Sequence, residues 1–397
     1  MAKPGLLVVT LLAAVLLMGC THTEESSIAP LTPTAGRVDP GLGPGTRALS
    51  FGPGYKGSPS WNPNGTRIAF TVDGYVMDGP TTSGESRRWT TKDFVATDAE
   101  WTSGDTLAIL GAASTSERGA EGSLYRANAG EGSLALKGTA KRVLAMSPIP
   151  GEDTLVFAFV SGPHESKLAL TRDGRTSYKS FADDPIEGRV SALSLSPDGD
   201  EAVMAVRPRG DSRTSEVRTF DFRQGEGQVI VRLEGHRELV GTPQWTKQGI
   251  YFVAGKQATS VDDDSSEPLF ELYRVPADGD APEPAPGVGE DFVASSIRVS
   301  PDDDRLAVIG RLNPKSPTNL YVLDPAVKKL VAITTNEDME IKTDPDDLAW
   351  SPDGGNVAII ARGTPSTEPE VRTEPADRLL RDFYNLYEIP VSEETTR

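Results

Sequence analysis

A short pattern of residues recurs along most of this chain of 397 residues. Each copy has an apolar strand, a tight turn and a second apolar strand, and the clearest turns are Ser196-Pro197-Asp198-Gly199 and Ser351-Pro352-Asp353-Gly354. Such turns form because Pro presets its φ and Gly accepts a positive φ. The apolar residue that ends the first strand recurs every 40 to 54 residues, at Trp61, Trp101, Met146, Leu195, Trp245, Val299 and Trp350.

Repeats of this length, with several short strands in each, are typical of a β-propeller. One blade cannot bury both of its faces alone, so blades stack around a central axis. We therefore predict an all-β, seven-bladed β-propeller with four-stranded blades. Six blades is the alternative, if the copy at Trp101 or the copy at Met146 belongs to an irregular blade.

The two ends of the repeat region predict how the ring closes. The last copy ends in a third strand at residues 385–391, and residues 46–51 precede the first innermost strand without a blade of their own. We predict that 46–51 pair with 385–391. This pairing would complete the last blade, close the ring and remove an exposed sheet edge.

Three segments carry a more specific signal: residues 59–78, 193–206 and 348–360. They resemble the TolB-like (WD-repeat-like) propeller unit, which reads Trp-Ser-Pro-Asp-Gly, then Ile-Ala-Phe, then Ile-Tyr-Val-Met-Asp. The resemblance covers residues 46–391 and implies a bacterial cell-envelope β-propeller lipoprotein. Propellers of this kind serve as docking platforms, as accessory domains of peptidases and, in some cases, as enzymes.

The N-terminal segment predicts export and lipidation. Residues 6–18 form a short apolar run that ends within the sequence Leu17-Met18-Gly19-Cys20. The whole segment resembles a bacterial lipoprotein signal. We predict a signal peptide at 1–19, a lipidated Cys20 that opens a flexible tether at 20–45, a propeller at 46–391 and a tail at 392–397. The protein would lie at the cell membrane or outer membrane, lipid-anchored and facing outside the cytoplasm. An ordinary secretory signal is the alternative.

The charge of the chain narrows the choice of partners. A formal net charge of −18 argues against nucleic acid and anionic lipid surfaces, because their phosphates attract basic patches. In a propeller, the loops between second and third strands and the loops between blades emerge on one face, and here these loops are long and acidic. The candidate partner-binding residues on that face are Asp183, Asp184, Asp262, Asp263, Asp264, Glu337, Asp338, Glu340, Asp344, Asp346 and Asp347.

Signals for catalysis are weak. The Gly-x-Ser-x-Gly elbow of a hydrolase is absent from the sequence, and the three histidines, at positions 22, 164 and 236, have no motif spacing. The acidic runs 262–264 and 302–304 lack the spaced oxygen ligands of a calcium loop. We predict no catalytic residues, no cofactor-binding or metal-binding residues, and no cofactor. Trp89 does not share the repeat register and is a candidate for an exposed contact.

These observations predict a non-catalytic, membrane-tethered, monomeric propeller of the cell envelope. It would dock an envelope protein or peptide, of cationic character, through the acidic loop face. The alternative is an enzyme or receptor that binds a cell-wall saccharide or peptide in the central funnel.

Overall fold

The computed structural model describes residues 42–50, 52–82, 85–91, 94–113, 122–129, 137–149, 152–172, 179–181, 185–210, 214–234, 238–255, 269–276, 279, 281–336, 339–363 and 383–391. The predicted signal peptide (1–19), Cys20, most of the predicted tether (20–45) and the predicted tail (392–397) lie outside the described residues. In the part that is described, no helix has the length and apolarity that crossing a bilayer requires.

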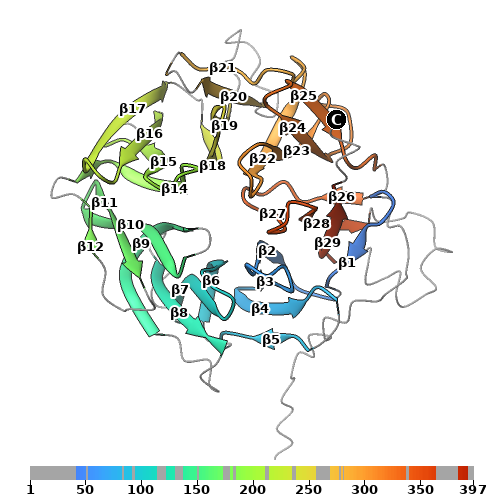
Figure 1. Cartoon of the computed structure of the whole chain (residues 1–397), viewed down its shortest axis with the longest axis horizontal. Coiled ribbons are helices and arrows are strands. Elements are labelled where there is room, and N and C mark those ends of the chain that lie inside the picture. The colour runs from blue at the N-terminus through green and yellow to red at the C-terminus, as the bar shows by residue number, and fades with distance from the viewer. Residues whose placement is uncertain are drawn as a thin grey trace, which may run out of the picture.

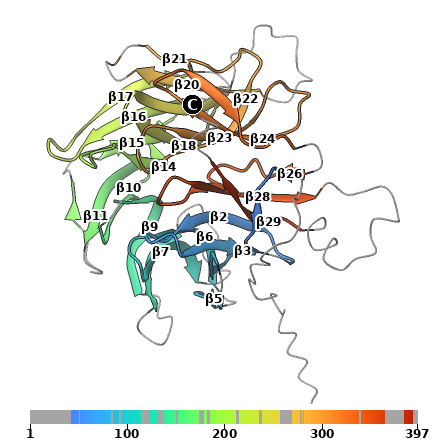
Figure 2. The same cartoon turned by 45° about the vertical axis from the view of Figure 1, so that its right-hand side comes forward.

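The described chain is all-β, and its strands form antiparallel sheets that follow one another around a central axis (Figures 1 and 2). Four sheets have four strands each, and in each of them the strand order follows the chain order. They contain β2 (Lys56–Trp61), β3 (Arg67–Val72), β4 (Tyr75–Pro80) and β5 (Arg87–Arg88); β14 (Arg189–Leu195), β15 (Glu201–Arg207), β16 (Ser215–Asp221) and β17 (Glu226–Leu233); β18 (Leu239–Thr246), β19 (Gly249–Gly255), β20 (Phe270–Pro276) and β21 (Glu283–Pro284); and β22 (Val293–Val299), β23 (Leu306–Arg311), β24 (Asn319–Asp324) and β25 (Lys329–Ala332).

The copies at Trp101 and Met146 share one larger sheet. It contains β6 (Phe94–Trp101), β7 (Thr106–Ala113), β8 (Gly122–Asn128), β9 (Lys137–Pro148), β10 (Thr154–Gly162), β11 (Glu165–Arg172), β12 (Lys179–Ser180) and β13 (Ile186–Glu187). The strand β9 joins the two copies because its first half pairs with β8 and its second half with β10. These are the two copies for which the sequence left the blade count open.

The last sheet brings the two ends of the described chain together. It contains β26 (Met339–Ile341), β27 (Leu348–Trp350), β28 (Asn356–Gly363), β29 (Asn385–Pro390) and β1 (Arg47–Ala48). As predicted, the N-terminal segment pairs with the last strand, with Arg47 opposite Glu388 and Ala48 opposite Tyr387. Arg47 also forms an ion pair with Glu388 across this edge.

The propeller begins earlier in the chain than predicted. Leu42, which the sequence placed in the flexible tether, is fully buried in an apolar cluster with Ile359, Tyr387 and Ile389. The prediction that the tether runs to residue 45 therefore differs from the structure. The physical reason is that Leu42 is a large apolar side chain, and burying it on the last sheet stabilises the ordered segment.

The recurring turns have the chemistry that their sequence predicts. In the turn after β27, the Ser351 hydroxyl lies 2.6 Å from Asp353 Oδ1 and accepts a hydrogen bond of 2.8 Å from the Asn356 backbone N–H. Gly354 has φ of 67°, which a glycine adopts without steric cost. The turn after β14 repeats these contacts with Ser196, Asp198 and Glu201.

The core lies between neighbouring sheets. Val217 of β16 and Phe252 of β19 belong to one buried cluster, and Tyr251 of β19 and Val308 of β23 belong to the next. Consecutive innermost strands contact one another in the order β2, β6, β9, β14, β18, β22 and β27, and β27 contacts β2. Each sheet is thus supported on both faces, as stacking of the repeats requires.

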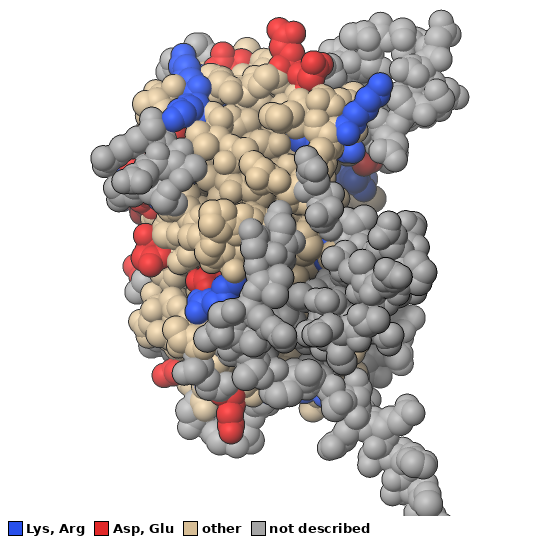
Figure 3. Space-filling view, turned by 90° about the vertical axis from the view of Figure 1, so that its right-hand side faces the viewer, with Lys and Arg blue, Asp and Glu red and all other residues tan. Residues whose placement is uncertain are grey.

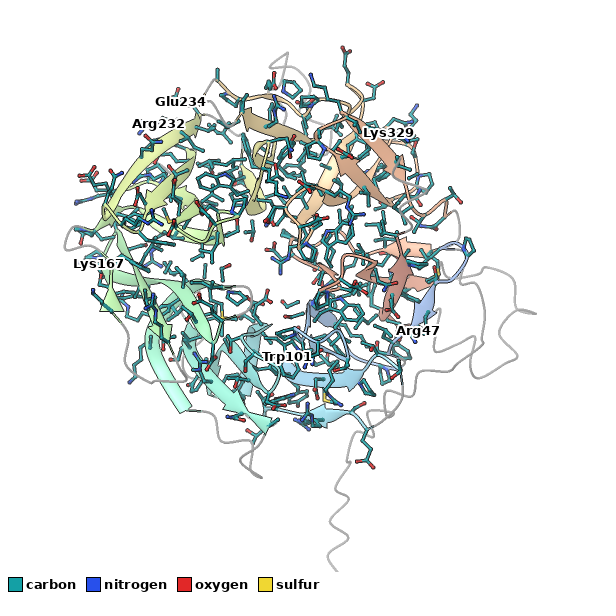
Figure 4. The ribbon with its side chains drawn as sticks, viewed as in Figure 1. Arg47, Trp101, Lys167, Arg232, Glu234 and Lys329 are labelled. Atoms are coloured by element: carbon teal, nitrogen blue, oxygen red, sulfur yellow. The ribbon has the colours of Figure 1, made fainter. Side chains whose placement is uncertain are left out.

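The repeated tryptophans are part of this core, as predicted, and Figure 4 shows Trp101 on the inner side of the ring. Trp61, Trp101 and Trp350 are buried, and Trp245 is partly buried. The interpretation of Trp89 as an exposed contact is wrong. Its side chain is buried and packs edge-on against Trp101, with ring centroids 5.6 Å apart.

Candidate functional site at the axis and loop face

We call one end of the ring the loop face. Here the second strand of each repeat turns into the third, as at Asp73-Gly74 between β3 and β4, and here the innermost strands begin. Large apolar side chains are exposed on this face, namely Tyr55, Val95 and Leu312. On the described part of the side shown in Figure 3, acidic and basic side chains lie scattered among uncharged residues.

The innermost strands are irregular where they approach the axis. The pairing register shifts between Gly57 and Ser60 in β2, between Ala96 and Asp98 in β6, between Val240 and Gln244 in β18 and between Ala294 and Ser296 in β22. Such bulges bend a strand and redirect the side chains beside them. At equivalent positions of the repeats, they place Ser58, Asp98, Thr242 and Ser296 at or next to the irregularity.

The last sheet replaces this small bulge with a longer excursion. Ile341 of β26 pairs with Ala361, and Leu348 of β27 pairs with Ile359. The residues between them, 342–347, therefore leave the sheet opposite the single residue Ile360. We call this segment the axial loop.

The tip of the axial loop reaches inner strands of other sheets. The Asp346 backbone N–H donates a hydrogen bond of 3.2 Å to Ser296 Oγ of β22, and the Asp346 carboxylate lies beside Gly241 of β18, where a Cβ would be 3.9 Å from Asp346 Oδ1. Pro345 packs on Gly241 of β18 so closely that a Cβ on Gly241 would lie 3.2 Å from Pro345 Cβ. Because the β22 sheet stands between β18 and β27, the loop extends over the mouth of the axis.

Below the loop tip, an ion pair spans the axis. Arg298 Nη2 of β22 lies 2.8 Å from Glu100 Oε1 of β6, and Ser60 Oγ of β2 donates a hydrogen bond of 2.7 Å to Glu100 Oε2. Asp98 lies two residues before Glu100 and accepts a hydrogen bond of 2.8 Å from the Ala99 N–H. We call Asp98, Glu100, Arg298 and Asp346 the axial cluster.

The axial cluster contains three carboxyl groups and one guanidinium group, so its acids interact strongly. Burial raises the pKa of Asp98 to about 8, and the negative charges of Glu100 and Asp346 add to this effect while Arg298 opposes it. Burial also raises the pKa of Asp346, although the positive charge of Arg298 counteracts part of the shift. The cluster therefore retains protons at pH values where exposed carboxyl groups have lost them.

The base of the axial loop is held by Lys342. Its Nζ donates a hydrogen bond of 2.7 Å to the Lys56 carbonyl, lies 2.6 Å from Asp347 Oδ2 and 3.2 Å from Asp344 Oδ2, and lies 3.9 Å from the centroid of the Tyr55 ring. Burial raises the pKa of Asp347 to about 6, although Lys342 opposes this shift. Blades at the two ends of the chain are thus joined by a charged network as well as by β1 and β29.

Beside this network, two tyrosines form an aromatic pair on the loop face. Tyr55 and Tyr384 meet edge to face, with ring centroids 6.3 Å apart. The Tyr55 hydroxyl donates to Asp344, and the Tyr384 hydroxyl donates to Glu340, which also forms an ion pair with Arg362. We call Tyr55, Tyr384, Glu340 and Asp344 the tyrosine platform.

The structure separates the predicted acidic residues into two groups and leaves others undescribed. Glu340 and Asp344 are exposed on the tyrosine platform. Asp346 and Asp347 are half-buried and buried, respectively, at the axis, so their expected place on the outer rim is wrong. The reason is that 342–347 bulges inward from a strand and does not pass outside it. The residues that lie outside the described part of the chain are Asp183, Asp184, Asp262, Asp263, Asp264, Glu337 and Asp338.

Sequence reasoning missed the axial cluster. Glu100 and Arg298 directly precede the repeat anchors Trp101 and Val299, so the repeat alignment itself contained the signal that both face the axis. His164 is exposed in the turn between β10 and β11, and His236 lies outside the described residues. Within the described ranges, no group of three or more His, Cys, Asp or Glu side chains has the geometry to hold a metal ion.

No protein-family model matches the chain, and no curated protein matches its sequence. Solved structures do match. Puromycin hydrolase has a TM-score of 0.58 and 13% identity, with 78% of this chain and 50% of that chain covered. The Swd1 β-propeller domain of Myceliophteria thermophila has a TM-score of 0.53 and 14% identity, with 87% and 100% covered. A putative TolB from Agrobacterium tumefaciens has a TM-score of 0.43 and 14% identity, with 79% and 92% covered.

These likenesses show the fold: the chain is a β-propeller. The chain spans half the length of puromycin hydrolase. The prediction that the chain is not an enzyme is contradicted by this match. Puromycin hydrolase is named as an enzyme, and half of its chain has the same fold as this protein. The absence of a hydrolase motif in the sequence therefore does not exclude a role in catalysis.

Proposed function

We propose that this protein is a docking propeller whose loop face, centred on the tyrosine platform, binds another protein or peptide. The observation that carries the proposal is Tyr55, which is 56% exposed although its hydroxyl and its ring are both held by neighbouring side chains. Large aromatic side chains that are fixed before binding contribute strongly to protein interfaces, because little conformational entropy is lost on association.

The charge around Tyr55 supports a cationic partner. Glu340 and Asp344 are exposed beside the tyrosines, and the net charge of the chain is −18. The acidic loop residues predicted from the sequence at 183–184, 262–264 and 337–338 belong to the same proposal. Complementary charge accelerates association and is screened by salt, so we expect binding to weaken as ionic strength rises.

Three further features complete the proposal. The seven repeat anchors favour seven blades, with β9 shared between the copies at Trp101 and Met146 and with β1 completing the last blade. The lipoprotein-like signal supports lipidation of Cys20 and a tether between the membrane and the propeller. The protein would then lie in the cell envelope, at the cell membrane or outer membrane, facing outside the cytoplasm.

The docking site can be tested by site-specific photo-crosslinking in cells. A photoreactive amino acid at position 55 should capture a defined partner. The same amino acid at Val327, which is 63% exposed in the turn between β24 and β25 at the opposite end of the ring, should not. With the purified partner, Tyr55→Ala should weaken binding by about 30-fold, the effect expected of an interface hot spot.

Val327→Ala is the matched control, and it should leave binding unchanged. The proposal fails if positions 55 and 327 capture the same species. It also fails if Tyr55→Ala and Asp344→Asn both bind the partner as tightly as the wild type does.

A second candidate function is supported by the match to puromycin hydrolase. Here the propeller would be the part of a hydrolase that receives the substrate, with the loop face and axis as the binding region. Titration calorimetry of the purified chain with puromycin tests this. Binding that is weakened by substitutions in the axial cluster supports the candidate, and no detectable binding argues against it.

A further inference from the structure

The axial loop connects two features that are otherwise separate. Its tip, Asp346, belongs to the axial cluster, and two residues earlier Asp344 accepts the hydrogen bond from the exposed Tyr55. A displacement of the tip would therefore change the support of the tyrosine platform.

The tip is seated among like charges. From β6, Asp98 and Glu100 act on Asp346, and from β22 Arg298 does so. The β2 and β18 strands contribute Ser58, Ser60, Thr242 and Gln244, which are uncharged. Within the axial loop, Lys342 is already engaged by Asp344 and Asp347. One guanidinium group thus faces three carboxyl groups.

The backbone conformation of the tip is one that few residue types adopt easily. Asp346 has φ of 66°, in the left-handed region that aspartate and asparagine tolerate better than most residues. Its seat depends on the hydrogen bond to Ser296 and on the contact of Pro345 with Gly241. None of these contacts involves a charged partner, so they do not offset the charge of the cluster.

We propose that the axial loop is a proton-controlled plug, seated over the propeller axis when the axial cluster holds a proton and released when that proton is lost. When Asp98 and Asp346 are both ionised beside Glu100, Arg298 neutralises only one of the three charges. Repulsion at this partly buried site then favours a loop that carries Asp346 away from Asp98. The base of the loop stays in place because Lys342 remains paired with Asp347.

Release of the plug has a consequence for binding, and this part rests on the proposed docking at Tyr55. When residues 343–346 move, Asp344 withdraws from the Tyr55 hydroxyl, and the platform loses its fixed geometry. Partner binding should therefore be tighter at slightly acidic than at slightly alkaline pH. Such an effect is a shift of population between two states of one loop.

The plug can be followed without any partner. Thr343 is exposed in the axial loop, so a nitroxide attached to Thr343→Cys, in the full chain carrying Cys20→Ser, reports the mobility of the loop. We expect an immobile spectrum at pH 6 and a growing mobile component with a midpoint near the pKa of Asp98, which is about 8.

Two variants test the cause of this transition. Asp98→Asn retains an acceptor for the Ala99 N–H, and Asp346→Asn tolerates the positive φ, so both should fold; near-UV circular dichroism checks this. In both variants the loop should stay immobile up to pH 9. Asp105→Asn, an exposed acid at the opposite end of the ring, is the matched control and should behave as the wild type does.

The outcomes separate the plug from the docking site. A wild-type loop with unchanged mobility between pH 6 and 9, or a transition that persists unchanged in both variants, overturns the plug. If the loop moves and the partner crosslinked at Tyr55 binds equally at both pH values, the control of binding is wrong while docking stands. If no partner is captured at Tyr55 and the loop still moves, docking is wrong while the plug stands.

Discussion

Arg298 and Glu100 face one another across the propeller axis, with Nη2 of the arginine 2.8 Å from Oε1 of the glutamate. Their strands, β22 and β6, are not neighbours, because β27 and β2 lie between them in the ring. The pair therefore joins sheets that share no core. It forms the floor below the axial loop, and Ser60 fixes the orientation of Glu100.

Loss of one member of this pair should destabilise the protein. Arg298→Met leaves Glu100 partly buried without its counter-ion, and removal of one partner from such a pair costs about 3 kcal/mol of unfolding free energy. The double variant Glu100→Gln, Arg298→Met should recover most of this loss. Urea unfolding of Arg298→Met, Glu100→Gln and the double variant measures the coupling. As a control, Asp200→Asn breaks the exposed pair with Arg223 and should cost below about 1 kcal/mol.

The pH dependence of stability should carry the signature of Asp98. Its pKa in the folded protein is about 8, against an ordinary value of 3.8, so the folded state binds more protons than the unfolded state between these values. The contribution of Asp98 to stability is therefore fully present below about pH 4 and is lost as the pH rises through 8.

Each proton that the folded state binds in excess of the unfolded state lowers the unfolding free energy by up to about 1.4 kcal/mol per pH unit as the pH rises. Access of water to the axis reduces this slope. Asp98→Asn should flatten the profile between pH 5 and 8, measured by urea unfolding at fixed ionic strength. Asp105→Asn should not. Identical slopes in wild type and Asp98→Asn would show that Asp98 is ionised in this range.

The sequence predicted the fold well because the repeat is redundant. Several copies of one turn and seven apolar anchors specify stacked β-sheets, and the pairing of β1 with β29 followed from a missing strand. The anchors also identified Trp61, Trp101 and Trp350 as core residues. Local chemistry and global packing agree in these elements, which is why simple pattern reasoning succeeded.

The site was harder to predict because it depends on departures from the repeat. Asp346 and Asp347 follow a short strand, β26, that the sequence reading took for part of a loop, so their inward course was missed. Trp89 lies outside the anchor register, and only the structure shows that it packs on Trp101. Leu42 was assigned to a polar, flexible segment because its neighbours outweighed the single apolar residue.

Two glycines with similar positive φ angles should respond differently to alanine. Gly287 has φ of 86°, and a Cβ there would lie 2.1 Å from the carbonyl oxygen of Lys328. Gly210 has φ of 82° with no heavy atom within 4 Å of such a Cβ. Both alanine variants incur about 1 to 2 kcal/mol of backbone strain. Gly287→Ala should cost clearly more, since the Lys328 backbone must move. Equal thermal shifts in the two variants would mean that this segment yields easily.

Leu42 provides a test of how firmly the N-terminal segment belongs to the propeller. Its side chain is fully buried against the last sheet, in the same cluster as Tyr387 and Ile389, so Leu42→Ala removes buried apolar atoms and leaves a cavity. Such substitutions cost about 2 to 5 kcal/mol when the surrounding structure cannot collapse. Val327→Ala, at a 63% exposed position, should change stability by less than about 0.5 kcal/mol. Urea unfolding compares the two. A large loss for Leu42→Ala means that the ends of the chain fold as one unit, whereas a loss as small as that of Val327→Ala would place residue 42 in the tether.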